Sequence, residues 1–113
     1  MSIEEIIMSY WKSWQSHSDW DVTRRYMKDY FKLDAGIFKT ESADQLIEMM
    51  KKGNPWKEIN LLDFVVTNNK GALVYEGIDS VTNVKTRISK IITVVDNKVA
   101  SCITTIAPLS GKE

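Results

Sequence analysis

The feature that most constrains the fold is a single change in hydrophobic period, which falls between Gly53 and Trp56, near the middle of the 113-residue chain. Before this point, apolar residues recur with the spacing of one face of an α-helix. After it, long segments rich in Val, Ile and Thr are separated by short polar turns, which is typical of antiparallel strands. The sequence therefore predicts one α+β domain over residues 1–113, with helices first and a sheet after them.

The helical half contains three predicted helices. Ser2 and Glu5 have the spacing of a capping box, which places the start of the first helix at about residue 3. Asp19 is a good N-cap for a short second helix, and Ser42 with Gln45 predicts the start of a third. The predicted apolar sides are Ile3, Ile6, Ile7, Tyr10, Trp11 and Trp14 in the first helix, Val22, Tyr26, Met27 and Tyr30 in the second, and Ala43, Leu46, Ile47 and Met50 in the third. A short strand is expected within residues 31–40.

Four long strands are predicted after Pro55, at residues 56–67, 72–80, 84–95 and 99–107. In the third of them, Ile88, Ile92 and Val94 share one face. The other face holds Arg87, Ser89 and Thr93, together with the apolar Ile91 and Val95. Because both faces carry apolar side chains, we expect each face to meet something other than water.

The composition excludes several classes of function. Lys and Arg number 15, as do Asp and Glu, so no net charge favours nucleic acid or an anionic membrane surface. One cysteine, Cys102, cannot form an internal disulfide, and one histidine leaves no cluster with metal-ligand spacing. The start MSIEEII lacks the basic residues of a signal peptide, and no apolar run is long enough to cross a bilayer. We expect a cytoplasmic protein without metal, nucleic-acid or membrane partners, and without a cofactor, because no glycine-rich phosphate loop is present.

Two stretches, taken with the order of the elements, resemble the nuclear transport factor 2-like, or SnoaL-like, superfamily. They are the aromatic first helix running into HSDWD, and the segment GALVYEGIDSVTNVKTRISKIITVVDNKVASCITTI, in which DNK replaces the commoner glycine-containing turn. The resemblance implies three N-terminal helices packed in the concave face of a strongly curved, mostly antiparallel sheet. This arrangement is a cone-shaped, cystatin-like α+β barrel with a cavity at its wide end. The superfamily resemblance also implies a homodimer.

In such a cone, the tryptophans of the first helix either belong to the core or form the walls of a ligand cavity, and the two interpretations overlap. The resemblance predicts a cavity for a small apolar molecule. The residues expected to line it are Trp11, Trp14, Tyr26, Tyr75, Arg87 and Ser89. We expect a second copy of the chain to cover the outer face of the sheet, because the helices of one chain cover only the concave face.

Two residues match the catalytic pair of ketosteroid isomerase, an enzyme of this superfamily. There, an aspartate on the first strand moves a proton and a tyrosine on the first helix donates to the developing oxyanion, and the matching residues here are Asp34 and Tyr10. Lys32 lies two residues before Asp34 and is expected to pair with it, which weakens the carboxylate as a base. The region that would supply a second acid, 89–91, contains no carboxylate. His17 is either a solvated loop residue or a general base.

Two functions therefore stay open from the sequence. One is a non-catalytic module that binds a small apolar molecule, which the missing second acid and Lys32 favour. The other is a small cofactor-independent enzyme, an isomerase, cyclase or dehydratase, that uses Asp34 as base and Tyr10 as donor. Whether Asp34 and Tyr10 face one enclosed cavity distinguishes the two.

Overall fold

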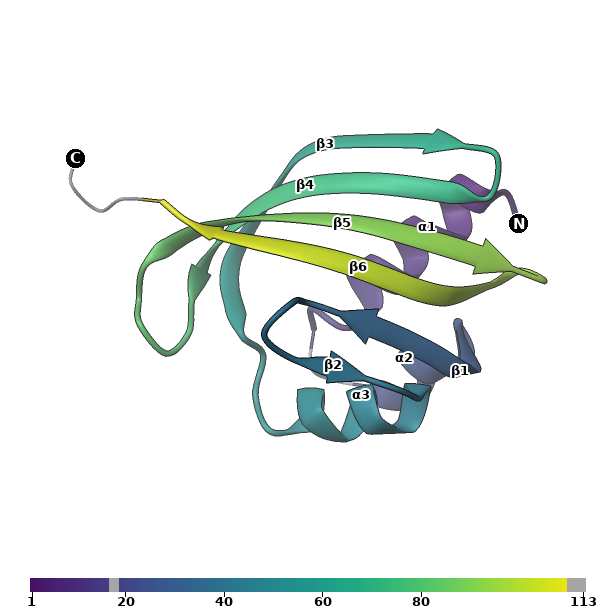
Figure 1. Ribbon diagram of the computed structural model, residues 1–113, viewed down its shortest axis with the longest axis horizontal. Coiled ribbons are helices and arrows are strands. Elements are labelled where there is room, and N and C mark those ends of the chain that lie inside the picture. Colours follow the sequence, from purple (N-terminus) through teal and green to yellow (C-terminus); the bar gives the residue numbers. More distant parts are fainter. Residues whose placement is uncertain (17–18, 110–113) are drawn as a thin grey trace.

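The computed structural model describes residues 1–16 and 19–109, and this part of the chain forms three helices and one curved sheet of six strands (Figure 1). The helices are α1 (Ile3–Ser13), α2 (Trp20–Arg25) and α3 (Ala43–Lys51). The strands are β1 (Met27–Asp34), β2 (Lys39–Thr40), β3 (Trp56–Thr67), β4 (Lys70–Asp79), β5 (Lys85–Val95) and β6 (Lys98–Pro108). The predicted α+β class and the four long strands are confirmed. No helix of the described ranges is long and apolar enough to cross a membrane.

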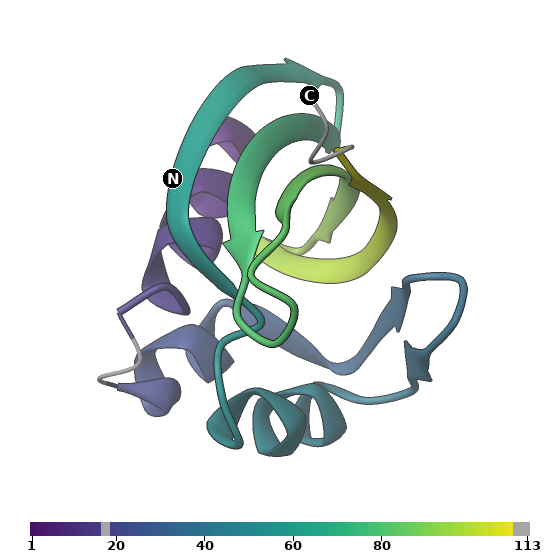
Figure 2. The ribbon, with the colours of Figure 1, turned by 90° about the vertical axis from the view of Figure 1, so that its left-hand side faces the viewer.

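The sheet has the strand order β2-β1-β6-β5-β4-β3, and its two edges do not pair with each other. Strand β1 runs parallel to β6, with Leu33 opposite Cys102, and all other neighbours are antiparallel. Figure 2 shows that the long strands bend into arcs, with α2 and α3 below them. Helix α1 packs against β4, β5 and β6, whereas α3 packs against β1 and β2. The two helices therefore pack against different strands of the same curved sheet.

All three predicted helix starts are confirmed. The Ser2 hydroxyl accepts from the backbone N–H of Glu5 at 3.1 Å, and the Glu5 carboxylate accepts from the N–H of Ser2 at 2.9 Å, which completes the capping box. Asp19 accepts from the N–H groups of Asp21 and Val22 at the start of α2. Ser42 accepts from the N–H of Gln45 at 3.2 Å. Local capping chemistry thus determines where each helix begins.

The predicted extent of the second helix was wrong. Helix α2 ends at Arg25, and the chain enters β1 at Met27, so the predicted helical face through Met27 and Tyr30 does not form. Tyr30 is 54% exposed. The reason is tertiary pairing: Met27 lies opposite Val99 of β6, and Phe31 and Leu33 alternate into the core. A parallel partner far away in sequence outweighs the local helical spacing.

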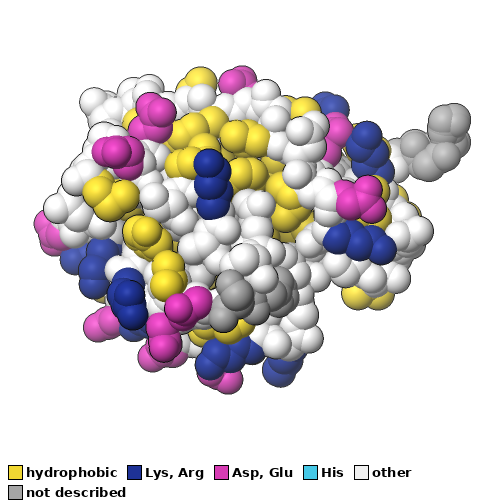
Figure 3. All heavy atoms as spheres, turned by 180° about the vertical axis from the view of Figure 1, so that it is seen from behind, with side chains coloured by type: hydrophobic (Ala, Val, Ile, Leu, Met, Phe, Trp, Pro, Cys, Tyr) yellow, Lys and Arg dark blue, Asp and Glu magenta, His cyan; other side chains and the backbone are white. Residues whose placement is uncertain are grey.

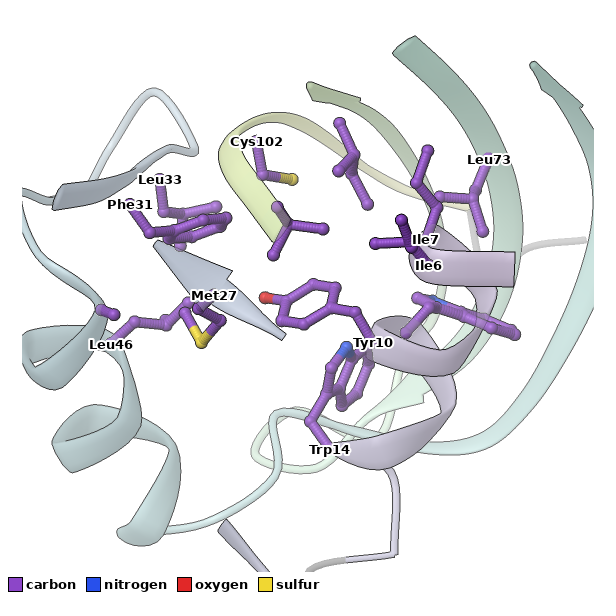
Figure 4. Close-up of a cluster of buried hydrophobic side chains, with 14 of the residues drawn as sticks. Ile6, Ile7, Tyr10, Trp14, Met27, Phe31, Leu33, Leu46, Leu73 and Cys102 are labelled. Carbon is purple, nitrogen blue, oxygen red and sulfur yellow. The ribbon is translucent and has the colours of Figure 1, made fainter. Parts of the chain in front are cut away.

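The apolar face of α1 forms the centre of the core (Figure 4). Ile6, Ile7, Tyr10, Trp11 and Trp14 are all buried, which confirms the interpretation of the tryptophans as core residues. The Ile7 side chain of α1 packs closely over Gly71 of β4. A Cβ atom at Gly71 would lie 2.5 Å from Cδ1 of Ile7, so a larger residue would displace the Ile7 side chain from this contact.

Apolar surface is not confined to the interior. Figure 3 shows the side opposite to that of Figure 1, where hydrophobic side chains gather in the upper middle and charged side chains lie mostly around them. The exposed large apolar residues of the described chain include Leu62 and Val65 of edge strand β3. These surfaces remain available for contact with other molecules.

We expect Trp14→Ala to lower the free energy of unfolding by about 3–5 kcal/mol, because a side chain that is 2% exposed leaves a large cavity when it is truncated. Lys12→Ala, on the exposed side of the same helix, is the control and should change it by less than about 0.5 kcal/mol. Urea unfolding followed by circular dichroism measures both. Equal midpoints for the two variants would contradict the assigned helix face.

Candidate ligand-binding cavity

A cavity of about 290 Å³ lies between the helices and the concave side of the sheet. Helix α1 contributes Tyr10 and its C-cap residue Trp14, and β5 contributes Lys90. The remaining lining residues come from β1 and the following loop (Leu33, Ala35, Phe38), from α3 (Leu46, Met49, Met50), from the segment after α3 (Gly53, Pro55, Trp56) and from β6 (Thr104, Ile106). Most of these side chains are apolar, so the cavity suits a largely apolar occupant.

Lys90 is the functional residue that the sequence analysis missed. Strand alternation places it on the inner face of β5, between the fully buried Ile88 and Ile92. Its Nζ atom lies 4.9 Å from the centroid of the Trp14 ring and 5.8 Å from that of Tyr75. The assignment of Ile88 and Ile92 to one face already contained the signal, because Lys90 falls between them in the same alternation.

No carboxylate of the described residues lies within ion-pair distance of Lys90. The aromatic rings of Trp14 and Tyr75 are its cation–π partners. The ammonium group is partly buried and lines the cavity. A positive charge without a counter-charge therefore lies in an otherwise apolar site.

Burial sets the protonation of the groups near Lys90. It raises the pKa of Tyr10, of Tyr75 and of the Cys102 thiol, and the charge of Lys90 opposes these shifts only in part. For Lys90 itself, burial lowers the pKa, whereas Tyr75, Cys102 and Tyr10 raise it through the negative charges that they carry when they ionise at high pH. At neutral pH both tyrosines are uncharged, and the Lys90 ammonium group faces the rings of Trp14 and Tyr75.

Two further side chains in the lining carry hydrogen-bond donors. The indole Nε1 atom of Trp14 is itself covered by the surrounding protein and has no hydrogen-bond partner among the described residues. The Tyr10 hydroxyl points from α1 toward the side of the core formed by Met27 and Phe31 (Figure 4), and no described side chain or backbone group hydrogen bonds to it. The polar part of the cavity thus offers donors and a positive charge. Thr104, the remaining polar lining residue, is within 3.3 Å of the Cys102 sulfur through its hydroxyl.

The predicted aromatic residues fall into two groups. Tyr10 and Trp14 line the cavity, whereas Trp11 and Tyr75 pack against residues that line it. The Trp11 ring lies 5.2 Å from that of Tyr75 and meets Trp14 edge-on at 6.5 Å. Tyr26 is partly buried at the C-cap of α2, where its carbonyl accepts from the N–H of Val99.

Arg87 and Ser89 lie on the outer face of β5, away from the cavity. Arg87 donates to the Glu76 carboxylate of β4 through two nitrogens, at 3.0 and 2.6 Å. Lys85 is 3.5 Å from the same carboxylate, and these two cations hold the pKa of Glu76 below its ordinary value, Arg87 contributing most. Arg87 therefore pairs across the sheet.

The structure does not bring Asp34 and Tyr10 together. Asp34 ends β1 on its exposed face, with its side chain 51% exposed, and its carboxylate accepts from the N–H of Gly36 at 2.9 Å. Its cationic neighbour is Lys39, at 4.0 Å, and not Lys32, which pairs with Glu41 at 3.7 Å. The expected Lys32 pair was therefore wrong, because hairpin partner β2 brings Lys39 opposite Asp34.

The sequence left open whether His17 is a solvated loop residue or a general base, and it predicted no metal site. His17 lies outside the described residues. Among the residues that are described, no group of three or more His, Cys, Asp or Glu side chains is arranged to hold a metal ion.

No family model matches the sequence, and no curated protein shows significant sequence similarity to it. Solved structures do share its architecture. An NTF2-like protein of unknown function from Cytophaga hutchinsonii superposes with a TM-score of 0.79 at 9% identity, covering 96% of this chain and 92% of that one. An LEH-like epoxide hydrolase from M. tuberculosis gives 0.76 at 9% identity, covering 90% and 80%. A de novo designed protein with a curved β-sheet gives 0.77 at 15% identity, covering 96% and 89%.

These similarities show that the chain has the NTF2-like fold, which confirms the resemblance seen in the sequence. At such low identity they establish the architecture alone. The proteins that share it include one of unknown function and one hydrolase, so the fold by itself does not select a chemistry.

We expect Lys90→Met to stabilise the ligand-free protein by about 1 kcal/mol, because it replaces an uncompensated charge by an apolar side chain of similar length. Lys12→Met on the exposed face of α1 is the matched control and should leave the free energy of unfolding within about 0.5 kcal/mol. Urea unfolding at neutral pH measures both. A lower midpoint for Lys90→Met would mean that the contacts with Trp14 and Tyr75 outweigh the cost of burying the charge.

Proposed function

We propose that the protein binds a small, largely apolar molecule in the cavity between α1, α3 and the concave side of the sheet. The observation that supports this most directly is the cavity itself, with a volume of about 290 Å³ and a mostly apolar lining. Ligand sites are typically concave and apolar, with a few polar groups that orient the ligand. Tyr10, Trp14, Lys90 and Thr104 are the lining residues with polar atoms here.

Binding is favoured over catalysis because the cavity lining contains no carboxylate or histidine from the described residues. A proton-transfer enzyme needs a base within hydrogen-bond reach of its substrate. Asp34, the predicted base, ends β1 on the exposed face of the strand. Tyr10 is uncharged at neutral pH, since burial raises its pKa, so it serves as a donor and not as a base.

The alternative function is a small cofactor-independent enzyme of the isomerase, cyclase or dehydratase type, with Tyr10 as donor and Asp34 as base. One observation favours it: Tyr10 lines the cavity, and its hydroxyl has no hydrogen-bond partner among the described residues, so it is free to donate to an oxyanion. A conversion of bound ligand that is lost in Asp34→Asn would select this alternative.

The binding proposal predicts that N-phenyl-1-naphthylamine, an uncharged apolar fluorophore, gains fluorescence on titration with the protein. Ala35→Phe fills part of the cavity and should weaken this binding by about tenfold or more. Ala107→Phe makes the same change on an exposed part of β6 and should alter the affinity by less than about threefold. Binding that is absent from the unmodified protein, or that is equal in both variants, would contradict the proposal.

We further propose that two copies of the chain associate through the outer face of the sheet. Val65, Ala72, Ile91 and Ile103 lie opposite one another on four neighbouring strands and form one apolar row across this face. Val65, Ile91 and Ile103 are 58%, 48% and 57% exposed in the single chain. A two-fold partner that presents the same row would remove this apolar surface from water.

Sedimentation velocity at micromolar concentration should then give twice the monomer mass. Ile103→Asp places a charge in the row and should shift the species to the monomer, since an unpaired charge in an apolar interface is costly. Val81→Asp, in the turn between β4 and β5, is the control and should remain dimeric. A monomer in the unmodified protein would disprove this mode of association.

Two finer expectations from the sequence stay with these proposals. The curvature of the long strands in Figure 2 supports a cone-shaped, cystatin-like α+β barrel open at its wide end. The single cysteine, Cys102, is buried as a free thiol, which supports a cytoplasmic location.

A further inference from the structure

We infer that the occupant of the cavity is an apolar carboxylic acid in its ionised form, and that the ammonium group of Lys90 binds its carboxylate. This inference rests on the proposed binding function and specifies the class of ligand. It is carried by three features of the cavity: a cation without a counter-charge, hydroxyl donors in the lining, and an apolar mouth.

The first feature is the unpaired cation. Lys90 projects from the inner face of the sheet. Neighbouring strand β4 carries two carboxylates: Glu76 lies on the outer face, where Arg87 and Lys85 hold it, and Asp79 ends the strand and accepts from the N–H groups of Val81 and Thr82. The faces of Trp14 and Tyr75 offer Lys90 partial compensation only. A ligand carboxylate would supply the counter-charge that the site lacks.

The second feature is the set of donors. Besides Lys90, the side chains of Tyr10 and Thr104 line the cavity, and each carries a hydroxyl group that can donate a hydrogen bond. A carboxylate has two oxygens and accepts several hydrogen bonds, so it can accept from the Lys90 ammonium and from a hydroxyl donor together. An amine could accept from none of them in its protonated form and would be repelled by Lys90.

The third feature is the direction of the cavity. Tyr10 and Trp14 are almost fully buried, whereas Phe38, Met49, Gly53 and Pro55 line the cavity but are exposed. The mouth therefore lies near the β1–β2 loop and the end of α3, and the donors lie at the deep end. An acid would enter with its carboxylate first and leave its hydrocarbon body against Leu46, Met50 and Ile106, where flexible methionines adapt to its shape.

The test is a matched series of octanoate, octanamide and octylamine, titrated by calorimetry into the unmodified protein. These probes share one hydrocarbon chain and differ in the charge of the headgroup. Octanoate should bind about 10- to 100-fold more tightly than octanamide, and octylamine should bind most weakly. Octanamide that binds as tightly as octanoate would overturn the carboxylate inference and leave the binding function standing.

Variants assign the effect to Lys90. Lys90→Met should weaken octanoate binding by about 10- to 100-fold and change octanamide binding by less than about threefold. Lys90→Arg should restore most of the preference for octanoate, and Lys12→Met should match the unmodified protein. Equal loss of both probes in Lys90→Met would mean that Lys90 acts only through packing, which would also overturn the inference.

The failure of the broader proposal has a different signature. If octanoate, octanamide and N-phenyl-1-naphthylamine all fail to bind the folded, unmodified protein, the binding function itself is wrong and the inference falls with it. If Lys90→Met does not fold, two other measurements test the carboxylate inference. They are the preference for octanoate over octanamide in the unmodified protein and the same preference in Lys90→Arg.

Discussion

The contact between the apolar face of α1 and the curved sheet places the aromatic side of the cavity. Ile7 packs over Gly71 of β4, and Trp14, at the C-terminal end of α1, covers Lys90 of β5. Trp11 packs against Tyr75. One helix and its C-cap thus supply both the core that stabilises the fold and two of the residues that line the cavity. Because core and site share residues, a change that loosens the packing also displaces this part of the lining.

The parts of the fold that depend on local chemistry were predictable from the sequence. The caps at Ser2, Asp19 and Ser42, and the long strands after Pro55, follow from residues that are close together in the chain. The boundary between α2 and β1 was not predictable in this way, because Met27 is drawn into a strand by a partner more than seventy residues away. Tertiary pairing outweighed a helical spacing that was otherwise consistent.

The candidate site shows the same division. Tyr10 and Trp14 were found because an amphipathic helix faces its core in a regular way. Asp34 was selected by resemblance, and its placement depends on the short hairpin with β2, which the sequence did not reveal. The position of Lys90 on the inner face of β5 was predictable from strand alternation alone. It was missed because a lysine in a strand is usually exposed to solvent. Its position is costly for the folded protein, and such a cost is common where a residue serves binding.

The parallel pairing of β1 with β6 has a consequence for the order of folding. Strand β1 is synthesised well before β6, its partner in the sheet, because β3, β4 and β5 lie between them in the sequence. The β3–β6 meander can assemble through short turns, whereas β1 must wait until β6 is synthesised. The wall of the cavity that contains Leu33 and Ala35 is therefore completed only after β6 has been made. A nascent chain lacking β6 would contain α1 and its tryptophans without the enclosed space that they line.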